Sequence, residues 1–366
     1  MTSGQSSSCE CPATIRTSGG DQMTAVKTEP EEEIDMIRFG VLGAARIVPW
    51  ALLEPAKRRT DVEIVAVAAR RQGSAEAFAK EHGISRYYNS YEELLADPDI
   101  DVVYNPLPPN LHAEYSIKAL EAGKHVLCEK PFAMSGAEAE AMQAAAERAN
   151  RRIVEAFHDR YHPVFEHISH VVSSGRLGAI RKLTAVFNHT IPDIPGEFRR
   201  DPKMCGGALM ELGCYPVHWC RSLLREEPEV VAADAVVSST NCDEEMTAEF
   251  LFPSGVKASV EAKMSLGWEY HARFIIEGDQ GTLRADNSLL PHLGHTIIED
   301  IGGVPRQYTV AGQTTFDHQL DAFVSALIQG KPLPTEGADP LGNTRTIEAI
   351  YAKAGFNREE MKWARS

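Results

Sequence analysis

The sequence has no long apolar run and no excess of basic residues, and both absences narrow its function. No apolar stretch approaches the ~18 residues that a helix needs to cross a bilayer, so we expect no membrane span. The chain carries 37 Lys and Arg residues against 52 Asp and Glu residues, a net charge of −15. Such a balance repels nucleic acid and anionic lipid, so neither is expected as a partner.

Cysteine is sparse and lacks the spacing of a metal site or a disulfide framework. The seven cysteines are scattered, mostly within predicted elements. This usage predicts free thiols and a reducing, cytoplasmic setting. The spacing of His158-x-x-x-His162 suits zinc in principle, but Pro163 follows directly and no acidic partner is suitably fixed. We therefore expect surface or substrate roles for these histidines, and no metal.

The length predicts two domains. A single core stops growing at ~250–300 residues, and this chain has 366. Residues 1–35 lack apolar periodicity, an apolar h-region and a twin arginine, which predicts a flexible arm and not a secretory signal. We expect a dinucleotide-binding domain at 36–157, a substrate and oligomerisation domain at 158–340, and a C-terminal helix at 341–366 that packs back on the first domain.

The first domain opens with a strand, a glycine turn and a helix. The segment 37–42 alternates into Gly43, and 46–53 has helical character. Glycine and small residues let the backbone approach a pyrophosphate, while a helix N-terminus offers free N–H groups. The motif has fewer glycines than G-x-G-x-x-G, so by itself it fits a tight turn between packed elements as well. The cofactor contacts expected here are Gly40, Gly43, Ala44, Ala45, Arg46 and Ile47.

The strand at 62–69 bears on the choice of dinucleotide. An acidic residue at its end, roughly 20 residues past the glycines, binds the ribose 2′-hydroxyl of NAD. Here the strand runs into Arg70 and Arg71, with no acid. Guanidinium groups fit a 2′-phosphate through paired hydrogen bonds, so we expect NADP, although surface arginines are common.

A proline loop follows the strand at 101–105. It reads Pro106-Leu107-Pro108-Pro109-Asn110, which makes it rigid, poor in donors and suited to packing against a flat ring. Over 36–157, six strands alternate with helices. This pattern predicts an α/β fold with a doubly wound parallel sheet.

The next strand, 125–128, runs into Glu129, Lys130 and Pro131. In open α/β sheets ligands bind at the carboxyl ends of parallel strands, and the proline ends the strand there. We expect Lys130 at the seam between cofactor and substrate, where it holds a substrate hydroxyl or lowers the pKa of a neighbouring acid–base group. Taken alone, the triplet also fits a surface Glu-Lys pair.

The second domain has a different pattern. Runs of strands without intervening helices occur at 179–188, 229–239, 246–263 and 269–286. They predict an α+β domain with a large, mostly antiparallel open sheet that helices cover on one side. The other face is expected to join copies into a homodimer or a higher homo-oligomer.

A second group of protonatable residues lies in Gly206 to His218. Read as a helix, this segment places Glu211, Tyr215 and His218 on one face, and Pro216 bends the helix at Tyr215. Tyr215 is suited to exchange a proton with a substrate, with Lys130 lowering its pKa and Glu211 orienting a sugar. The alternative, for any one of the three, is a structural residue of the interior whose hydrogen bonds are satisfied.

In this order and spacing, the glycine turn, the Glu129-Lys130-Pro131 triplet and the Gly206 to Tyr215 helix resemble the Gfo/Idh/MocA family of oxidoreductases. The resemblance covers residues 36 to about 360. Many members carry Asp and His four residues apart on this helix. Glu and Tyr stand here, as in the branch where the tyrosine is proton donor and acceptor.

The resemblance also implies roles for single residues. Lys130 and Tyr215 are then catalytic, and Phe198-Arg199 is similar to a Trp-Arg pair near the nicotinamide. The implied substrate contacts are Glu211, His158, Arg199 and His218. The implied cofactor contacts in addition to those above are Leu107, Pro108, Asn110, His112, Glu129, Lys130, Arg160 and Arg199.

The resemblance looks closest to the aldose–aldose oxidoreductases. These hold NADP tightly, oxidise one aldose at C1 to the lactone and reduce a second aldose to the alditol. A xylose or dihydrodiol dehydrogenase with exchangeable NADP is the first alternative. A dinucleotide-dependent glycosidase and a non-catalytic regulator are further alternatives; the absence of a Gly-Gly-His-Gly loop argues against the former, and an intact Lys130 and Tyr215 against the latter.

Overall fold

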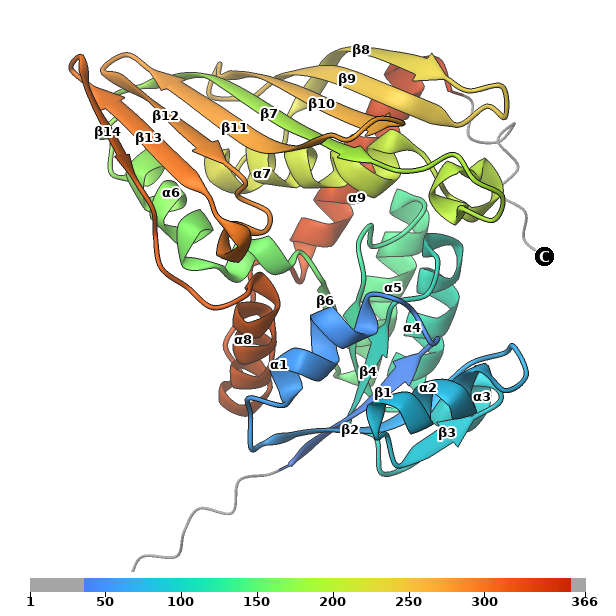
Figure 1. Ribbon diagram of the computed structural model, residues 1–366. Helices are drawn as coiled ribbons and strands as arrows, with labels where there is room; N and C mark the ends of the chain where they lie inside the picture. The colour runs from blue at the N-terminus through green and yellow to red at the C-terminus, as the bar shows by residue number, and fades with distance from the viewer. Residues whose placement is uncertain (1–35, 357–366) are drawn as a thin grey trace, which may run out of the picture. The chain divides into compact units, whose positions relative to one another are not determined.

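The computed structural model describes residues 36–356; the arm expected at residues 1–35 and the chain beyond 356 lie outside the described residues. The first domain is built on a six-stranded parallel sheet of order β3-β2-β1-β4-β5-β6 (Figure 1). This is the predicted doubly wound sheet, and its order reverses between β1 and β4, where such folds bind ligands. The strands are β1 (Ile37–Leu42), β2 (Val62–Ala68), β3 (Arg86–Tyr88), β4 (Val102–Asn105), β5 (His125–Cys128) and β6 (Ile153–Glu155).

Helices cover both faces of this sheet. They are η1 (Pro49–Leu53), α1 (Glu54–Ala56), α2 (Ser74–His82), α3 (Tyr91–Leu95), η2 (Pro109–Leu111), α4 (His112–Glu121) and α5 (Gly136–Ala149). Two of them begin where serine side chains accept a backbone N–H three residues on: Ser90 caps α3 and Ser135 caps α5. Such caps satisfy an N–H that the helix itself leaves free.

The second sheet has eight strands in the order β14-β13-β12-β11-β7-β10-β9-β8. All neighbours are antiparallel except β7 and β10, so the prediction of a mostly antiparallel sheet is confirmed. The segments expected at 246–263 and 269–286 each hold two strands joined by a turn, and the last two strands had no counterpart in the prediction. The strands are β7 (Ile180–Thr190), β8 (Glu229–Val237), β9 (Asp243–Leu251), β10 (Lys257–Ser265), β11 (Tyr270–Gly278), β12 (Gly281–Asp286), β13 (Thr296–Ile301) and β14 (Val304–Tyr308).

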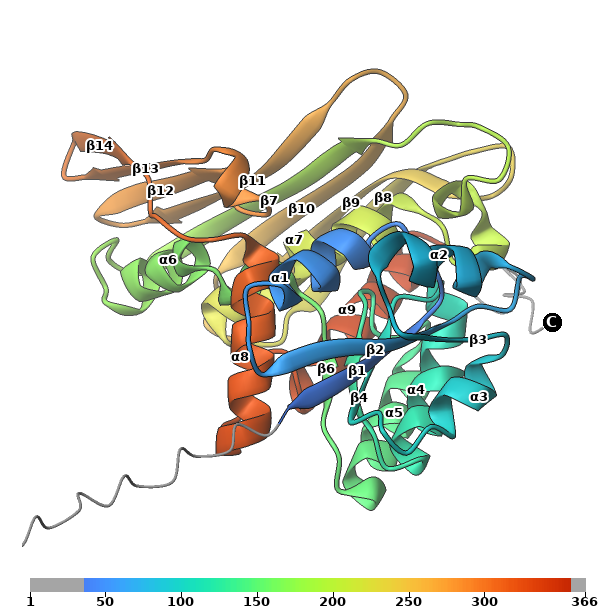
Figure 2. The ribbon, with the colours of Figure 1, turned by 60° about the horizontal axis from the view of Figure 1, so that its bottom comes forward.

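Helices α6 (Pro163–Ser173) and α7 (Cys214–Leu224) lie against one face of this sheet, and α9 (Ala338–Lys353) lies beside α7 and β8 (Figure 1). The other face carries no helix of the described chain (Figure 2). Burial follows this layout, because alternate residues of β9 and β10 are buried and exposed. The remaining short helices are η3 (His158–Tyr161), η4 (Phe198–Arg200), η5 (Pro202–Met204), η6 (Leu209–Gly213) and η7 (Pro291–Leu293).

Helix α8 (Thr315–Gln329) returns the chain to the first sheet. Its Phe323 packs in one apolar cluster with Phe39 of β1 and Leu127 of β5. Helix α9, by contrast, contacts α5 and α7, and its Ile350 belongs to the core of the second sheet. Within the described chain, every helix is too short or too polar to span a bilayer.

Candidate active site

A cavity of about 200 Å³ lies where the carboxyl ends of β4 and β5 meet the second domain. It gathers residues from seven separate stretches of sequence. Its five polar lining residues were all among the predicted site residues: Lys130, Glu129, Glu211, Tyr215 and His158. The lining residues are Ile47, Pro106, Leu107, Pro109, Glu129, Lys130, His158, Phe198, Glu211, Tyr215 and Phe316.

Lys130 is placed by the end of β5 and held by Glu211. Its Nζ donates to the Glu211 carbonyl oxygen at 3.1 Å and to Glu211 Oε2 at 3.4 Å. Burial lowers the pKa of Lys130, but the carboxylates of Glu211 and Glu129 outweigh it, and the pKa lies above its ordinary value. Lys130 is therefore a fixed cation that faces the cavity. It can stabilise negative charge on a substrate oxygen.

Glu129 is anchored beside it. Its Oε1 accepts the Tyr104 hydroxyl at 2.6 Å, and its Oε2 accepts the Lys130 backbone N–H at 3.3 Å. Burial raises the pKa of Glu129. The residue is thus oriented by two donors while part of it lines the cavity.

Tyr215 lies at the start of α7, directly after an irregular turn. The residues Leu209–Gly213 form a π-helical turn, which places the departure from α-helical geometry just before Pro216. Glu211 and Tyr215 both reach the cavity. His218 does not line it: the ring stacks on Phe157 at 4.1 Å, and its Nε2 lies 3.3 Å from Asp339. Glu211 and Tyr215 therefore share the cavity, whereas His218, one turn further along α7, lies against Phe157 and Asp339.

The hydroxyl of Tyr215 faces His158. Tyr215 Oη lies 3.3 Å from His158 Nε2, and His158 Nδ1 lies 2.8 Å from Thr315 Oγ1. Burial lowers the pKa of His158 to about 3, so the imidazole is neutral. Sequence reasoning missed Thr315 and Phe316, although the capping pattern Thr314-x-x-Asp317 marks the start of α8.

The expectation that Lys130 lowers the pKa of Tyr215 was wrong. Burial, followed by the nearby Glu129 carboxylate, raises the pKa of Tyr215 well above its ordinary value. The Lys130 ammonium lies 5.6 Å from the centre of the tyrosine ring, and its hydrogen bonds go to Glu211. Its charge is therefore shared with a carboxylate, and it makes no hydrogen bond to the hydroxyl among the described residues.

Arg199 follows Phe198, which lines the cavity, but Arg199 itself is not part of the lining. One edge of its guanidinium, Nε and Nη2, donates to the two oxygens of Glu197 at 2.7 and 2.6 Å, and this carboxylate raises the pKa of Arg199. A Cβ on Gly206 would stand 2.6 Å from the Arg199 backbone, so glycine is required for this close crossing.

The glycine turn after β1 has the geometry of a phosphate-approach loop. Gly43 has φ +90°, its N–H donates to Ala68 at 2.7 Å, and a Cβ there would stand 3.1 Å from Leu107. Gly40 is instead a packing position, because a Cβ would stand 2.7 Å from Ile100. Ala44 and Ala45 are half-buried in the loop, and Arg46 is exposed at its end.

Arg70 and Arg71 are exposed directly beyond β2. The Gly43 N–H donates to the Ala68 carbonyl, and Arg70 follows Ala68 by two residues along the chain. The arginines therefore lie close to the glycine turn. The Arg70 guanidinium lies 5.4 Å above the ring of Tyr91. An exposed guanidinium held over a ring near the glycine turn suits the binding of an anion.

Four further predicted cofactor contacts also lie outside the cavity lining. His112 is buried, with its ring nitrogens 2.9 Å from the Pro131 carbonyl and 2.7 Å from the Leu107 carbonyl, and burial lowers its pKa to about 4. It ties the proline loop to the segment after Lys130. The other three are Pro108, Asn110 and Arg160, whose guanidinium lies 4.7 Å above the ring of Phe165.

The histidine pair weighed for zinc does not act together. His158 faces Tyr215, whereas His162 Nδ1 accepts the Val164 N–H at 3.1 Å and so caps α6. In residues 36–356, no group of three or more His, Cys, Asp or Glu side chains is arranged to hold a metal ion. Cys128, Cys214, Cys220 and Cys242 are buried free thiols.

Comparisons with known proteins agree with this geometry. Residues 37–157 match the model of an oxidoreductase family with an NAD-binding Rossmann fold, and residues 165–284 match the GFO/IDH/MocA C-terminal domain. An uncharacterized oxidoreductase of Rhizobium meliloti is 34% identical over 327 residues, which are 88% of this chain and 98% of the relative. A D-xylose 1-dehydrogenase (NADP⁺) of Haloferax volcanii is 33% identical over 325 residues, covering 86% and 97% of the two chains.

Solved structures of oxidoreductases are also similar to this chain. An aldose–aldose oxidoreductase from Caulobacter crescentus, complexed with glycerol, has a TM-score of 0.80 and 28% identity over 89% of this chain and 98% of its own. A 3-ketoreductase from Actinomadura kijaniata, in complex with NADP and TDP-benzene, has a TM-score of 0.81 and 27% identity over 87% and 98%.

Proposed function

Because this chain belongs to the GFO/IDH/MocA oxidoreductase family, we propose that it is an NADP-dependent sugar oxidoreductase that couples two half-reactions. One aldose is oxidised at C1 to the lactone, and a second aldose is reduced to the alditol with the NADP(H) that stays bound. The observation that carries the proposal is the meeting of Lys130 and Tyr215 in one cavity at the carboxyl edge of a dinucleotide fold.

The chain's own loops fit the cofactor. The left-handed Gly43 and the exposed backbone that follows suit the pyrophosphate, and Arg70 and Arg71 suit a 2′-phosphate. Leu107 and Pro109 offer apolar surface for a flat ring beside Glu129. When bound, the nicotinamide accepts or returns a hydride at the reacting carbon.

The protein groups supply charge and proton transfer. Lys130 donates to the substrate oxygen and stabilises the charge that develops on it, while Tyr215 exchanges a proton with the same oxygen. Glu211 holds Lys130 in place and presents its remaining acceptor capacity to sugar hydroxyls. The same residues serve oxidation and reduction.

The charge of the cavity favours a neutral substrate. Two carboxyl groups, Glu129 and Glu211, and one ammonium, Lys130, line it. A sugar acid or a sugar phosphate would bring a further negative charge next to these carboxylates, at an electrostatic cost. A polyhydroxylated neutral sugar pairs with them through hydrogen bonds. The relatives named for aldoses and xylose support the same substrate class.

A second function is an NADP-dependent xylose or dihydrodiol dehydrogenase whose cofactor exchanges. The apolar walls favour it, because Ile47, Phe198 and Phe316 would also pack against a flat cyclic diol. Trans-1,2-dihydrobenzene-1,2-diol dehydrogenase of Xenopus tropicalis is 37% identical over 51% of this chain.

The absorbance of extensively desalted protein distinguishes the two. Glucose added without free cofactor should produce a stoichiometric band of reduced nicotinamide, and a second aldose should clear it. The Tyr215→Phe variant is the matched control, since it should retain cofactor but produce the band far more slowly. If the desalted protein carries no cofactor and oxidises sugar only when NADP is added, the first proposal is wrong. The protein would then be a dehydrogenase with exchangeable NADP.

The choice of NADP is tested at the end of β2. Replacing Arg70 and Arg71 by alanine should raise the dissociation constant for NADP, measured on protein stripped of cofactor, by about 10–100-fold, because the loss of one charge-assisted contact costs about 1.5–3 kcal/mol. The dissociation constant for NAD should change little. Arg181→Ala, an exposed arginine of the second sheet, is the control. Equal effects on both dinucleotides would contradict a role in 2′-phosphate binding.

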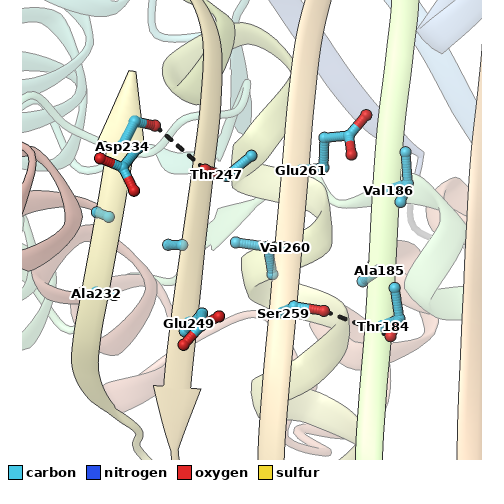
Figure 3. A pocket seen from close by; sticks show the side chains of 12 residues that line it. Thr184, Ala185, Val186, Ala232, Asp234, Thr247, Glu249, Ser259, Val260 and Glu261 are labelled. Carbon is cyan, nitrogen blue, oxygen red and sulfur yellow. Dashed lines mark hydrogen bonds between the residues drawn. The ribbon is translucent and has the colours of Figure 1, made fainter.

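We also propose that the helix-free face of the second sheet binds a second copy of the chain. Figure 3 shows this face as a hollow over β7, β8, β9 and β10, with a volume of about 190 Å³. Small side chains such as Ala232, Thr184 and Ser259 line it, and Glu249 and Glu261 stand beside them. Exposed Val236 and Val237 extend the apolar part along β8. Such a broad, shallow face suits a like surface better than a small ligand.

A further inference from the structure

The first turn of α8 reaches the reaction site although it lies a hundred residues beyond Tyr215 in the sequence. Thr315 Oγ1 lies 2.8 Å from His158 Nδ1, and His158 Nε2 lies 3.3 Å from Tyr215 Oη. Thr315 is fully buried, His158 is 6% exposed and Tyr215 is 5% exposed. The three residues therefore form a hydrogen-bond chain that is shielded from solvent and ends at the cavity.

The threonine is held in place from several sides. Thr314 and Asp317 form a capping box, and the Arg58 side chain of the first domain binds Asp317 Oδ1 at 2.7 Å. Phe316, the next residue, packs its ring 4.2 Å from the His158 ring and lines the cavity. The first turn of α8 thus fixes both the position of Thr315 and the plane of the imidazole.

Counting donors assigns a direction to the chain. The imidazole of His158 is neutral, so only one of its nitrogens carries a proton. Among the described residues, the Thr315 hydroxyl has His158 Nδ1 as its hydrogen-bond partner and no other. If Nδ1 carried the proton, the buried Thr315 O–H would lack an acceptor, which is costly. If Nε2 carries it, the Thr315 hydroxyl and the His158 N–H both have acceptors, and the donor left over is the Tyr215 O–H, which lies at the cavity.

We infer that Thr315 is a positioning residue for the proposed reaction: it donates to His158 Nδ1, so that His158 Nε2–H donates to the Tyr215 oxygen and leaves the Tyr215 proton for the substrate. The effect on catalysis rests on the proposed function, whereas the tautomer of His158 does not. It assigns to a neutral histidine the contact with the tyrosine oxygen that Lys130 does not make.

The proton count closes over the two half-reactions. In reduction, the O–H bond of Tyr215 breaks, a new O–H bond forms on the carbonyl oxygen of the second sugar, and the negative charge remains on the Tyr215 oxygen. His158 Nε2–H stabilises that charge by donating to it. In oxidation, the charged oxygen takes the hydroxyl proton of the first sugar, which restores Tyr215.

Other titratable groups face this chain and set the background for its titration. Glu129, Cys214, Asp159 and Tyr270 act on Tyr215, and all of them disfavour its ionised form. Lys130 and His292 act on His158. Because the neighbours of Tyr215 already disfavour its ionised form, loss of the His158 donor should raise the pKa of Tyr215 further.

The test compares Thr315→Val with Thr315→Ser. Valine has nearly the shape of threonine but no hydroxyl, whereas serine keeps it. We expect Thr315→Val to lower kcat at neutral pH by about tenfold, with KM nearly unchanged; this is less than the loss of the proton-transfer group itself would cost, because Thr315 acts only through His158. The pH at which kcat reaches half its maximum should move upward. Thr315→Ser should behave like the wild type in both respects.

A nitrogen NMR spectrum of labelled protein reads the tautomer directly, without turnover. The wild type and Thr315→Ser should show His158 protonated at Nε2, and Thr315→Val should show a shift toward Nδ1. His158→Phe should be as slow as Thr315→Val or slower, and His158→Gln, which keeps an N–H donor, should recover part of the rate.

The outcomes separate the two proposals. A wild type with His158 protonated at Nδ1, or a folded Thr315→Val variant with unchanged tautomer and pH profile, would overturn the positioning role. If the wild type oxidises no sugar, the proposed function is wrong. The tautomer of His158 can still be measured by NMR in that case. If Thr315→Val does not fold, His158→Phe and His158→Gln decide through the same pH profile.

Discussion

The two sheets differ in what covers them, and this decides where each one meets a ligand. Strand β4 of the first sheet is buried at every position, because helices lie on both faces. Strand β10 of the second sheet is buried mainly at alternate positions, because helices lie on one face. A strand covered on both sides can present a functional side chain only at its end. A sheet with one free face has a whole surface available.

The active site lies at the strand ends of the first sheet. Lys130 follows the end of β5, and Tyr215 comes from α7, which packs against the covered face of the second sheet. The helix thereby brings a residue of the second domain to the strand ends of the first. The free face of the second sheet takes no part in the cavity.

The largest effect is expected at the strand end. Lys130→Met keeps the length and apolar stem of the side chain but removes the charge, and should lower kcat/KM by about 10⁴-fold, about 5.5 kcal/mol in transition-state stabilisation. Steady-state kinetics with the preferred aldose measure it. Lys57→Met, at an exposed lysine of the first domain, should change nothing. A Lys130→Met enzyme within tenfold of the wild type would place the chemistry elsewhere.

Two neighbouring residues of β11 compare the faces of the second sheet. Phe274 is fully buried and packs its ring 5.5 Å from Trp219, whereas Ile275 is half-buried on the opposite face. Phe274→Ala should reduce the free energy of unfolding by about 3–5 kcal/mol. Ile275→Ala should cost under about 1 kcal/mol, if the free face is open to solvent. Urea unfolding of both variants gives the difference, and similar values would contradict the one-sided cover.

Glu155, at the buried end of β6, tests the dry interior of the first sheet. One oxygen accepts the Phe132 N–H at 2.8 Å, the other has no partner among the described residues, and burial raises the pKa of Glu155 well above 4.5. The folded protein therefore keeps a proton that the unfolded chain loses above pH 4.5, so stability falls as pH rises from there toward the folded pKa.

Glu155→Gln removes this cost. It should stabilise the protein at pH 7 by about 1–3 kcal/mol, the cost of an unpaired buried group, and the gain should vanish near pH 4. Urea unfolding at both pH values measures it. Glu166→Gln, at an exposed position on α6, is the control. A gain that is equal at both pH values would show that ionisation of Glu155 is not its cause.

The smallest effect on stability is expected on the free face of the second sheet. Val186→Arg fills the hollow of Figure 3 with a charged side chain. It should change the free energy of unfolding of the separated chain by under about 0.5 kcal/mol but abolish self-association. Light scattering coupled to size exclusion reads the mass, with Val186→Thr as the control. A wild type that is monomeric would contradict the proposed assembly.

Much of the chemistry was predictable because it lies in short, contiguous segments. Gly43 is itself a glycine, whereas Lys130 and Tyr215 are each followed by a proline. Glycine and proline restrict or widen the backbone angles at their own position. Such residues act over a few positions, so their consequence can be inferred without the fold. The two-sheet architecture followed from the change of pattern after residue 157 in the same way.

The remaining parts of the site depend on distant contacts. His218 shares a helix with Tyr215, yet its ring stacks on Phe157 and its Nε2 lies beside Asp339, outside the cavity lining. The ring nitrogens of His112 lie beside two backbone carbonyls in the interior. These positions depend on residues far away in the sequence.

The sequence by itself determined the six-stranded dinucleotide fold, the mostly antiparallel second sheet, and the lysine and tyrosine at their seam, because periodicity and glycine and proline positions act locally. Only the tertiary structure decided which groups face the Tyr215 hydroxyl. It paired Lys130 with Glu211 and brought the first turn of α8 to His158. Burial and long-range packing set the pKa of Tyr215, and neither is written in the neighbouring residues of the chain.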